Sequence, residues 1–413
     1  MTSAVDSTKS RELPPEPTAF GRSFWFSYAS NAAMMTAVSI LFFFADFVRV
    51  CGGTEEQLGR IVGIGMIGSI VMRFAQGVGI DHFGPRRIWL LSNGCYVAAC
   101  LMHLAIDRVD SPAVYLLRIM WQSSLAGVFG ASIAYVSGRA PIARMAEVIG
   151  TLGTSGFGGM MLGSALGRWI VGEGPPQRDH IDWLFIASAA MAAASLAFAY
   201  MAAETTTRRP IQRRRPPLWW LLRRYNPGWV LLMSVATGMG LNLPTVFLRP
   251  YMLDRNISAG VMLFFNLYPP VAFVTRVSLR RVPDRFGVRP MIAIGIGSLV
   301  IGTLLFLPVE SPVGLIGPAL FIGVAHACLF PAIVASSSGA FPARWRGIGT
   351  TFVLAMFDIG TLCGSPLAGE ILAAAERYGW PRYPTMFVTI SALLATCGAV
   401  YFACSRAVPK RRT

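Results

Sequence analysis

Long apolar runs separated by short polar turns fill this sequence from residue 23 to residue 405. A helix needs about 20 mostly apolar residues to cross a hydrocarbon core about 30 Å thick, and the sequence contains twelve such runs. None alternates over about ten residues as the strands of a membrane barrel do, so each run is expected to form a helix that satisfies its own backbone hydrogen bonds. The predicted spans are 24–46, 59–80, 87–107, 112–137, 147–171, 183–203, 228–250, 259–281, 289–308, 312–337, 347–374 and 385–405.

The polar turn after the second apolar run occurs again after the eighth. A shift of 203 residues places Arg73 on Arg276 and Asp81 on Asp284. Because a duplicated turn between apolar runs indicates homologous halves, the expected fold class is an all-α membrane protein with twelve transmembrane helices in two pseudo-symmetric six-helix halves. The expected boundaries are a cytoplasmic N-terminal tail at 1–22, an N-terminal half at 23–204, a linker rich in arginine and proline at 205–226, a C-terminal half at 227–405 and a basic cytoplasmic tail at 406–413.

Composition and charge agree with a membrane protein. Of the 413 residues, 54% are hydrophobic and 14% are charged, which excludes an ordinary soluble domain. The net charge of +16 comes largely from arginines in loops on one side of the predicted bundle, and cytoplasmic loops are the ones that collect arginine. Both termini are therefore expected in the cytoplasm, and no nucleic-acid partner is expected. The loop arginines that indicate this side are Arg86, Arg87, Arg139, Arg144, Arg280, Arg281, Arg285, Arg289, Arg344 and Arg346.

Three smaller features complete this picture. The seven cysteines show neither Cys-x-x-Cys spacing nor histidine pairing, so neither a metal site nor a cofactor is expected. Lysine occurs only at Lys9 and Lys410, a bias toward arginine that points to a GC-rich bacterial genome and hence to a bacterial inner membrane. The first 22 residues lack the short apolar segment of a signal peptide and are expected to form a disordered tail.

The linker between the halves carries seven arginines in residues 205–225, with Trp219 and Trp220 between the fifth and the sixth of them. One interpretation is a positively charged cytoplasmic connection. The other is an amphipathic helix that lies on anionic lipid. Both are favoured over a specific protein partner, and a monomer is expected.

The duplicated turn also matches a known signature. The first copy has Gly77, Asp81, Gly84, Arg86 and Arg87, and the second has Asp284, Arg285, Gly287 and Arg289 with Arg280 in place of the first glycine. This pattern resembles the signature G-x-L-a-D-r-x-G-r-r of the major facilitator superfamily. The resemblance implies a cytoplasmic latch, in which the carboxylate caps a helix N-terminus and the arginines pair with acids on neighbouring helices. An anion beside a helix N-terminus is stabilised by about 0.3–1 kcal/mol; the alternative is a solvated turn that only sets topology.

Glycines of the fifth and eleventh runs form a second pattern. Gly150, Gly159, Gly163 and Gly167 are similar to the antiporter motif G-x8-G-x3-G-P-x-x-G-G of the same superfamily, with Ser164 and Arg168 at two of its positions, and Gly360 and Gly364 belong to the corresponding copy. The resemblance implies export. The alternative interpretation is a ladder of small residues along which the two halves pack.

Charges inside predicted helices are candidates for function because they are unfavourable in lipid. Arg73 and Arg276 each lie eight residues before a turn aspartate, about 12 Å along a helix, where they are able to clamp one anion with guanidinium groups. Their positions resemble substrate arginines of the nitrate/nitrite, monocarboxylate and oxalate branches of the superfamily. The alternative is that each arginine reaches toward the cytoplasmic turn or bonds helix-end carbonyls.

Three further charged or titratable residues fall inside runs. Arg118 is a candidate for binding substrate or an aspartate, since the fourth helix lines the cavity in the resembled family. His326 and Asp358 are candidates for proton coupling, because histidine titrates near neutrality and a desolvated aspartate holds its proton more tightly; His326 is also a substrate-binding candidate. The alternative for His326 is a structural hydrogen bond.

Asp46 and Arg249 occupy equivalent positions at the outer ends of the first and seventh runs, since the shift of 203 relates them. A two-fold arrangement brings such positions face to face. We therefore expect an ion pair that closes the outer gate. The alternative is that each side chain ends its own helix among lipid headgroups.

The predicted function is secondary active transport by alternating access, namely proton-coupled export of a small organic or drug-like solute. The alternative within transport is uptake or exchange of a small anion, carboxylate or nitrate-like, through Arg73 and Arg276. A third possibility is a non-transporting membrane sensor or assembly factor on the same fold.

A primary pump is not expected, because the body of the chain lacks the lysine of a phosphate-binding loop. An enzyme is not expected either, because the four histidines are far apart in the sequence: they are His82, His103, His180 and His326.

Overall fold

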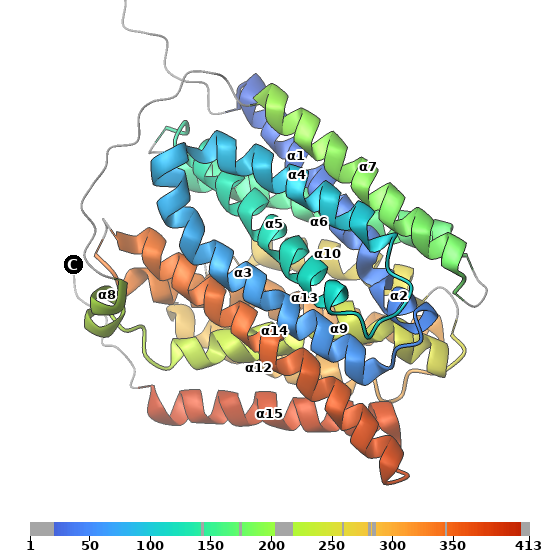
Figure 1. Ribbon diagram of the computed structural model, residues 1–413. Helices are drawn as coiled ribbons and strands as arrows, with labels where there is room; N and C mark the ends of the chain where they lie inside the picture. Colours follow the sequence, from blue (N-terminus) through green and yellow to red (C-terminus); the bar gives the residue numbers. More distant parts are fainter. Residues whose placement is uncertain are drawn as a thin grey trace, which may run out of the picture.

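The computed structural model describes residues 20–141, 144–172, 176–202, 218–257, 260–279, 282, 286–342 and 345–405, and these residues form helices and no strand. The elements, shown in Figure 1, are α1 (Arg22–Ile40), η1 (Leu41–Phe43), α2 (Phe44–Val50), α3 (Glu55–Phe83), α4 (Pro85–His103), α5 (Pro112–Ser137), α6 (Met145–Val171), α7 (Arg178–Ala202), α8 (Leu218–Arg224), α9 (Val230–Asp254), α10 (Gly260–Ser278), α12 (Val288–Leu304), η3 (Pro312–Leu315), α13 (Ile316–Gly339), α14 (Arg346–Arg377) and α15 (Arg382–Cys404).

A helix stands at each of the twelve predicted positions, so the all-α membrane fold is confirmed. Among the described residues, nine helices are long and apolar enough to span a bilayer, and α12 is apolar but shorter. Helices α4 and α6 complete the set.

The first span was predicted as one unbroken helix. In the structure the 3-10 turn η1 separates α1 from α2. Within the linker, α8 exposes Trp219 and Trp220; its binding to anionic lipid stays a prediction, and the tails 1–19 and 406–413 lie outside the described residues.

One glycine of the duplicated turn has the same backbone conformation in both copies. Gly84 and Gly287 have φ of 81° and 82°, a left-handed region that is strained for residues with a Cβ. Each glycine stands immediately before a helix, α4 or α12, and Pro85 fits the first position of α4 because its missing N–H is not needed there. The two homologous halves therefore share this glycine conformation at the start of a helix as well as their order of helices.

Small residues bring the fifth helix of each half against the first. An added Cβ at Gly159 would lie 2.5 Å from the carbonyl oxygen of Ala32, and one at Gly163 would meet that of Thr36, so α6 packs directly on the backbone of α1. In the second half, Gly360 faces the backbone of Val235 and Gly364 faces Met239, so α14 packs on α9 in the same way. Close approach of backbones is what small residues permit in membranes.

The glycine ladder thus lies within each half, and the alternative interpretation in which it joins the two halves is wrong. The reason is that α6 and α14 turn their glycine faces toward α1 and α9. Gly150 is not part of the ladder, because a Cβ there meets no described atom within 4 Å. Other glycines serve the contact between the halves: Gly59 and Gly63 of α3 receive Ser365 and Pro366 of α14.

Replacing Gly163 by alanine is expected to lower the melting temperature of the purified protein. The new methyl group collides with a backbone carbonyl that is unable to move aside, and overpacking of this kind destabilises by about 1–3 kcal/mol. Gly158→Ala, on the same helix and with no described atom within 4 Å of its added Cβ, is the matched control and should melt at or above the wild-type temperature, since alanine favours helix. Equal melting temperatures for the two variants would contradict the packing described above.

The two halves are bonded mainly at one end of the bundle, which carries the turn at Cys51 and is called here the Cys51 end; the opposite end, with the duplicated turns, is the Gly84 end. Helices α3 and α14 lie side by side across the two halves (Figure 1). Near the Cys51 end, three ion pairs connect the halves with N–O distances of 2.9, 2.8 and 2.6 Å: Asp46–Arg249, Glu55–Arg382 and Arg60–Glu370. The halves are therefore held together at the Cys51 end.

Candidate functional site

A cavity of about 350 Å³ lies between the two halves, a volume within the range of small-molecule sites. Its lining comes from the first span, α3, α5 and α6 in one half and from α9 and α14 in the other. The described lining residues are Met35, Val38, Leu41, Phe42, Phe44, Ala45, Leu58, Val62, Met66, Ser69, Arg73, Arg118, Trp121, Gln122, Leu125, Ala126, Phe129, Met160, Asn242, Thr245, Val246, Phe357 and Asp358. This is the candidate solute site.

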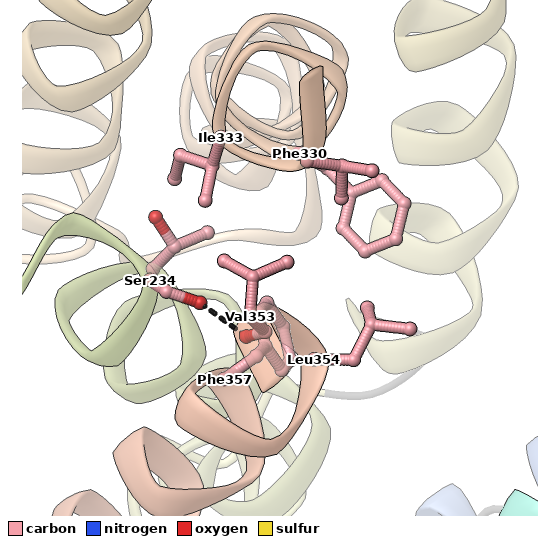
Figure 2. A pocket seen from close by; sticks show the side chains of 8 residues that line it. Ser234, Phe330, Ile333, Val353, Leu354 and Phe357 are labelled. Carbon is pink, nitrogen blue, oxygen red and sulfur yellow. Dashed lines mark hydrogen bonds between the residues drawn. The ribbon is translucent and has the colours of Figure 1, made fainter. Parts of the chain in front are cut away.

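A second pocket, of about 10 Å³, lies inside the C-terminal half between α9, α13 and α14. Figure 2 shows Ser234 on the opposite side of this pocket from Phe330, and its hydroxyl donates a hydrogen bond of 2.7 Å to the carbonyl of Val353. The volume is only enough for about one water molecule. We therefore place the solute site in the larger cavity.

Asp358 of α14 is bonded to two side chains of α3 at the wall of the cavity, across the contact between the two halves. Arg73 donates from Nε to Oδ2 at 2.5 Å and from Nη2 to Oδ1 at 3.2 Å, and Ser69 donates from its hydroxyl to Oδ2 at 2.6 Å. Residues 69 and 73 are four apart and so share one face of the helix. The aspartate side chain is 6% exposed and the arginine 22%. A two-pronged guanidinium–carboxylate bond in such surroundings is stronger than a neutral hydrogen bond.

The Asp358 cluster is also the bond between the halves that lies nearest the Gly84 end. Arg73 is ten residues from the last residue of α3, about 15 Å along the helix. The other hydrogen bonds and ion pairs that join described residues of the two halves lie closer to the Cys51 end, including that between Ser164 and Asn266. A change in the charge of Asp358 would therefore act on the bond between the halves that lies nearest the Gly84 end.

Arg118 of α5 lines the same cavity without an acidic partner among the described residues. Its stem crosses Gly65 of α3, where an added Cβ would lie 2.5 Å from Arg118 Cγ. Its guanidinium carbon lies 3.8 Å from the centre of the Trp121 ring and 4.4 Å from that of Phe44. The residue is 7% exposed, and Nε and Nη1 are buried without a hydrogen-bond partner in the described part of the chain.

His326 and Arg276 belong to a separate group in the C-terminal half. The ring of His326 bonds through Nδ1 to the hydroxyl of Tyr268 and stacks on that ring at 5.7 Å, while Phe157 of the other half approaches it edge-on at 6.3 Å. Arg276 lies on the same helix, α10, eight residues after Tyr268. Neither His326 nor Arg276 is among the described residues that line the large cavity.

The structure thus brings together some predicted site residues and separates others. Arg73 binds Asp358, although the sequence suggested anion binding for the arginine and proton coupling for the aspartate. Arg73 does not come together with Arg276. Sequence reasoning missed Ser69 and Gly65. Ser69 could have been found from its spacing of four residues from Arg73. Nothing in the sequence indicates that Gly65 supports Arg118.

Asp46 and Arg249 meet, although 203 positions separate them. Arg249 Nε donates to both carboxylate oxygens, at 2.9 and 3.2 Å, and the two side chains are 1% and 7% exposed. Arg249 also lies 5.4 Å from the Phe43 ring, and its Nη2 is buried without a described partner. The contact between equivalent positions is present, and its action as a gate stays a prediction.

The predicted latch is described only in part. Residues Asp284 and Arg285, the side chain of Asp81 and the surroundings of Gly77 lie outside what the structure describes. Arg86 lies 5.6 Å from the ring of Tyr200, and Arg289 donates to the carbonyl of Phe402 at 3.0 Å.

These latch contacts are pseudo-symmetric. Arg86 and Arg289 each reach the last helix of their own half, α7 or α15, and bind there an aromatic ring or a carbonyl. These contacts are with Tyr200 and Phe402, and the pairing with acids that the resemblance implied stays a prediction. Arg87 is exposed.

Comparisons with known proteins place this geometry in context. A family model described as Major Facilitator Superfamily matches residues 24–308 and 273–413. The comparison with curated proteins gives no match. Solved structures with the same fold include a point mutant of the nucleoside transporter NupG, at 12% identity, a TM-score of 0.77 and coverage of 93% of this chain and 100% of the other.

Two further structures share the fold. A D-xylose–proton symporter has 14% identity, a TM-score of 0.70 and coverage of 91% of this chain and 96% of its own. A bacterial homologue of the human lysosomal transporter Spinster, in an inward-facing and unoccupied conformation, has 14% identity, a TM-score of 0.69 and coverage of 96% and 100%. At these identities the likeness concerns the fold alone.

Proposed function

Because the chain belongs to the major facilitator superfamily, whose members are membrane transporters, we propose that it carries a small organic solute out of the cell in exchange for protons. The observation that supports this proposal is the position of Asp358. Its carboxylate lines the solute cavity, is nearly excluded from water and is bonded across the two halves to Arg73. One titratable group thus touches both the solute site and the contact that alternating access has to rearrange.

The coupling step follows from the charge of that carboxylate. A proton on Asp358 removes the attraction for Arg73, and breaking a buried ion pair in this way changes the free energy by several kcal/mol. The halves then lose the bond between them that lies nearest the Gly84 end. Release of the proton restores the bond, so the protonation of Asp358 biases the tilt of one half against the other.

The arginine-rich loops favour a cytoplasmic Gly84 end, so a structure bonded at the Cys51 end corresponds to a cavity facing the cytoplasm. Importers and exporters both adopt this state, and the direction of transport therefore rests on a resemblance. The glycine pattern of α6 and α14 resembles the antiporter motif of the family, which favours export.

The alternative of an anion clamp formed by Arg73 and Arg276 has less support. The first arginine is already bonded to Asp358, and the second lies with Tyr268 and His326. His326 has correspondingly less support as the proton site, since it bonds to the Tyr268 hydroxyl and is not among the described residues that line the cavity. A non-transporting sensor is the remaining class, and it predicts no solute flux.

A two-step experiment tests the proposal. A thermal-shift screen of purified protein against carboxylates, inorganic anions, sugars and cationic drugs identifies binding compounds, because a ligand of the folded state raises its apparent stability. The best compound is then loaded into liposomes that contain the protein and a pH-sensitive dye. We expect outward solute movement to be accompanied by proton entry, and an imposed proton gradient to accelerate it. Solute flux that neither moves protons nor responds to the gradient would refute the coupling, and absence of any flux would favour the sensor.

A further inference from the structure

We infer that the solute is a small organic monoanion with an apolar body, and that its anionic group is recognised by Arg118. This inference rests on the proposed function only in taking the large cavity as the solute site. It concerns the charge of the solute and does not depend on proton coupling or on the direction of transport.

The first argument is the balance of charge in the cavity. Among the described residues that line it, the charged ones are Arg73, Arg118 and Asp358. The ion pair between Arg73 and Asp358 is neutral as a unit, so one positive charge remains. A buried charge without a partner is unfavourable in a membrane protein. An anion in the cavity would supply that partner, whereas a cation would add to the uncompensated charge.

The second argument is the way in which Arg118 is held. The Trp121 and Phe44 rings contact the guanidinium through cation–π attraction, but these contacts do not accept hydrogen bonds from its N–H groups. Neither a hydrogen bond nor an ion pair connects the guanidinium to another described residue, and Nε and Nη1 are buried without partners. A planar guanidinium binds carboxylate through such N–H groups. The aromatic rings therefore orient the cation and leave its donors for an anion.

Gly65 indicates that this arrangement is built into the packing of α3 against α5. A side chain at position 65 would occupy the space of the Arg118 stem. Because the stem lies in this space and the guanidinium lies against two rings, Arg118 has little freedom to turn away from the cavity. The cation is thus positioned at the cavity wall before any solute binds.

The third argument concerns the rest of the solute. Apart from the three charged groups, the described lining is mostly apolar, with Val38, Phe42, Val62, Met66 and Leu125 among its members. Such a surface favours a hydrocarbon or aromatic body through burial of apolar area. Only one uncompensated cation is present among the described lining residues, which matches one negative charge rather than two. Aliphatic and aromatic monocarboxylates of modest size have this combination.

Paired acids and amides test the inference directly. The probes are benzoate with benzamide, phenylacetate with phenylacetamide and hexanoate with hexanamide, in which each amide has nearly the shape of its acid but no charge. Binding is measured calorimetrically and by thermal shift on the purified full-length protein at neutral pH. We expect at least one acid to bind at least tenfold more tightly than its amide.

Variants of Arg118 assign the preference to this residue. Arg118→Gln removes an unpaired buried charge and so is expected to fold, and it should lose the preference for acids tenfold or more. Arg118→Lys should keep part of the preference for acids, because lysine retains the positive charge but lacks the planar guanidinium. Arg144→Gln, an exposed arginine at the Gly84 end, is the matched control and should bind as the wild type does.

Three outcomes would overturn the inference. In the first, no acid binds more tightly than its amide. In the second, Arg118→Gln keeps the preference for acids. In the third, the preference is lost only in Arg73→Gln, which would assign the anion to Arg73. None of these results bears on proton movement. Conversely, acid binding that depends on Arg118 in a protein that moves no protons would refute the proposed coupling and leave the anion site intact.

Discussion

Replacing Asp358 by asparagine is expected to reduce proton-driven transport by at least a hundredfold while solute-for-solute exchange continues. Asparagine has nearly the same shape and is able to accept the hydrogen bond from Ser69, but it neither binds nor releases a proton near neutral pH. A proton gradient then has no group through which to act on the bond to Arg73. The measurement is a comparison of gradient-driven flux with counterflow of labelled solute in the same liposomes.

A second carboxylate on the same helix provides the control for this prediction. Glu370 of α14 is also bonded to an arginine of α3, Arg60, but both side chains are about half exposed, at 50% and 48%. Exposed pairs contribute about 0–1 kcal/mol, so Glu370→Gln should leave both assays within about twofold of the wild type. If Asp358→Asn retained gradient-driven flux, or if Glu370→Gln lost it equally, Asp358 would not be the coupling group.

Inverting one charge of the Asp46–Arg249 pair is expected to abolish transport and lower the yield of folded protein. Asp46→Arg would place two cations in a site where the side chains are 1% and 7% exposed, and removing one partner of a buried pair costs about 3–5 kcal/mol. The double variant Asp46→Arg/Arg249→Asp restores opposite charges. We expect it to recover a clear part of both yield and flux.

The recovery should be incomplete for a structural reason. Arg249 lies over the Phe43 ring, and a carboxylate at position 249 would lack that contact. Inversion of the exposed Arg60–Glu370 pair is the control, and its single variants should retain most activity. A double variant at 46 and 249 that is no better than the single ones would show that the charge pair does not hold the Cys51 end closed.

Much of the fold could be predicted because membrane helices are specified locally. The length of each apolar run determines whether it spans the bilayer, and the absence of water forces each run to satisfy its own hydrogen bonds. The duplicated turn revealed the two halves for a similar reason, since Gly84 and Gly287 are required by their backbone conformation wherever the turn occurs. The repeat even predicted the contact between Asp46 and Arg249, because a two-fold arrangement brings equivalent positions together.

The same symmetry failed for Arg73 and Arg276. Equivalent positions meet only close to the pseudo-two-fold axis, and these two arginines lie on α3 and α10, which pack against different helices. Arg73 instead meets Asp358, 285 positions away in the sequence. The partner of the glycine ladder could not be predicted either. The spacing of small residues predicts a close contact between helices but does not identify the partner helix.

The sequence by itself thus determined the number of helices, the two halves, the duplicated turn and the set of charges that the membrane would have to tolerate. Those features depend on residues near one another in the chain and on the low polarity of lipid. Only the tertiary structure decided which of the charges neutralise each other and which is left over. That outcome depends on side-chain packing between helices far apart in the sequence, and it is what distinguishes Asp358, paired with Arg73, from Arg118, whose guanidinium has no acidic partner among the described residues.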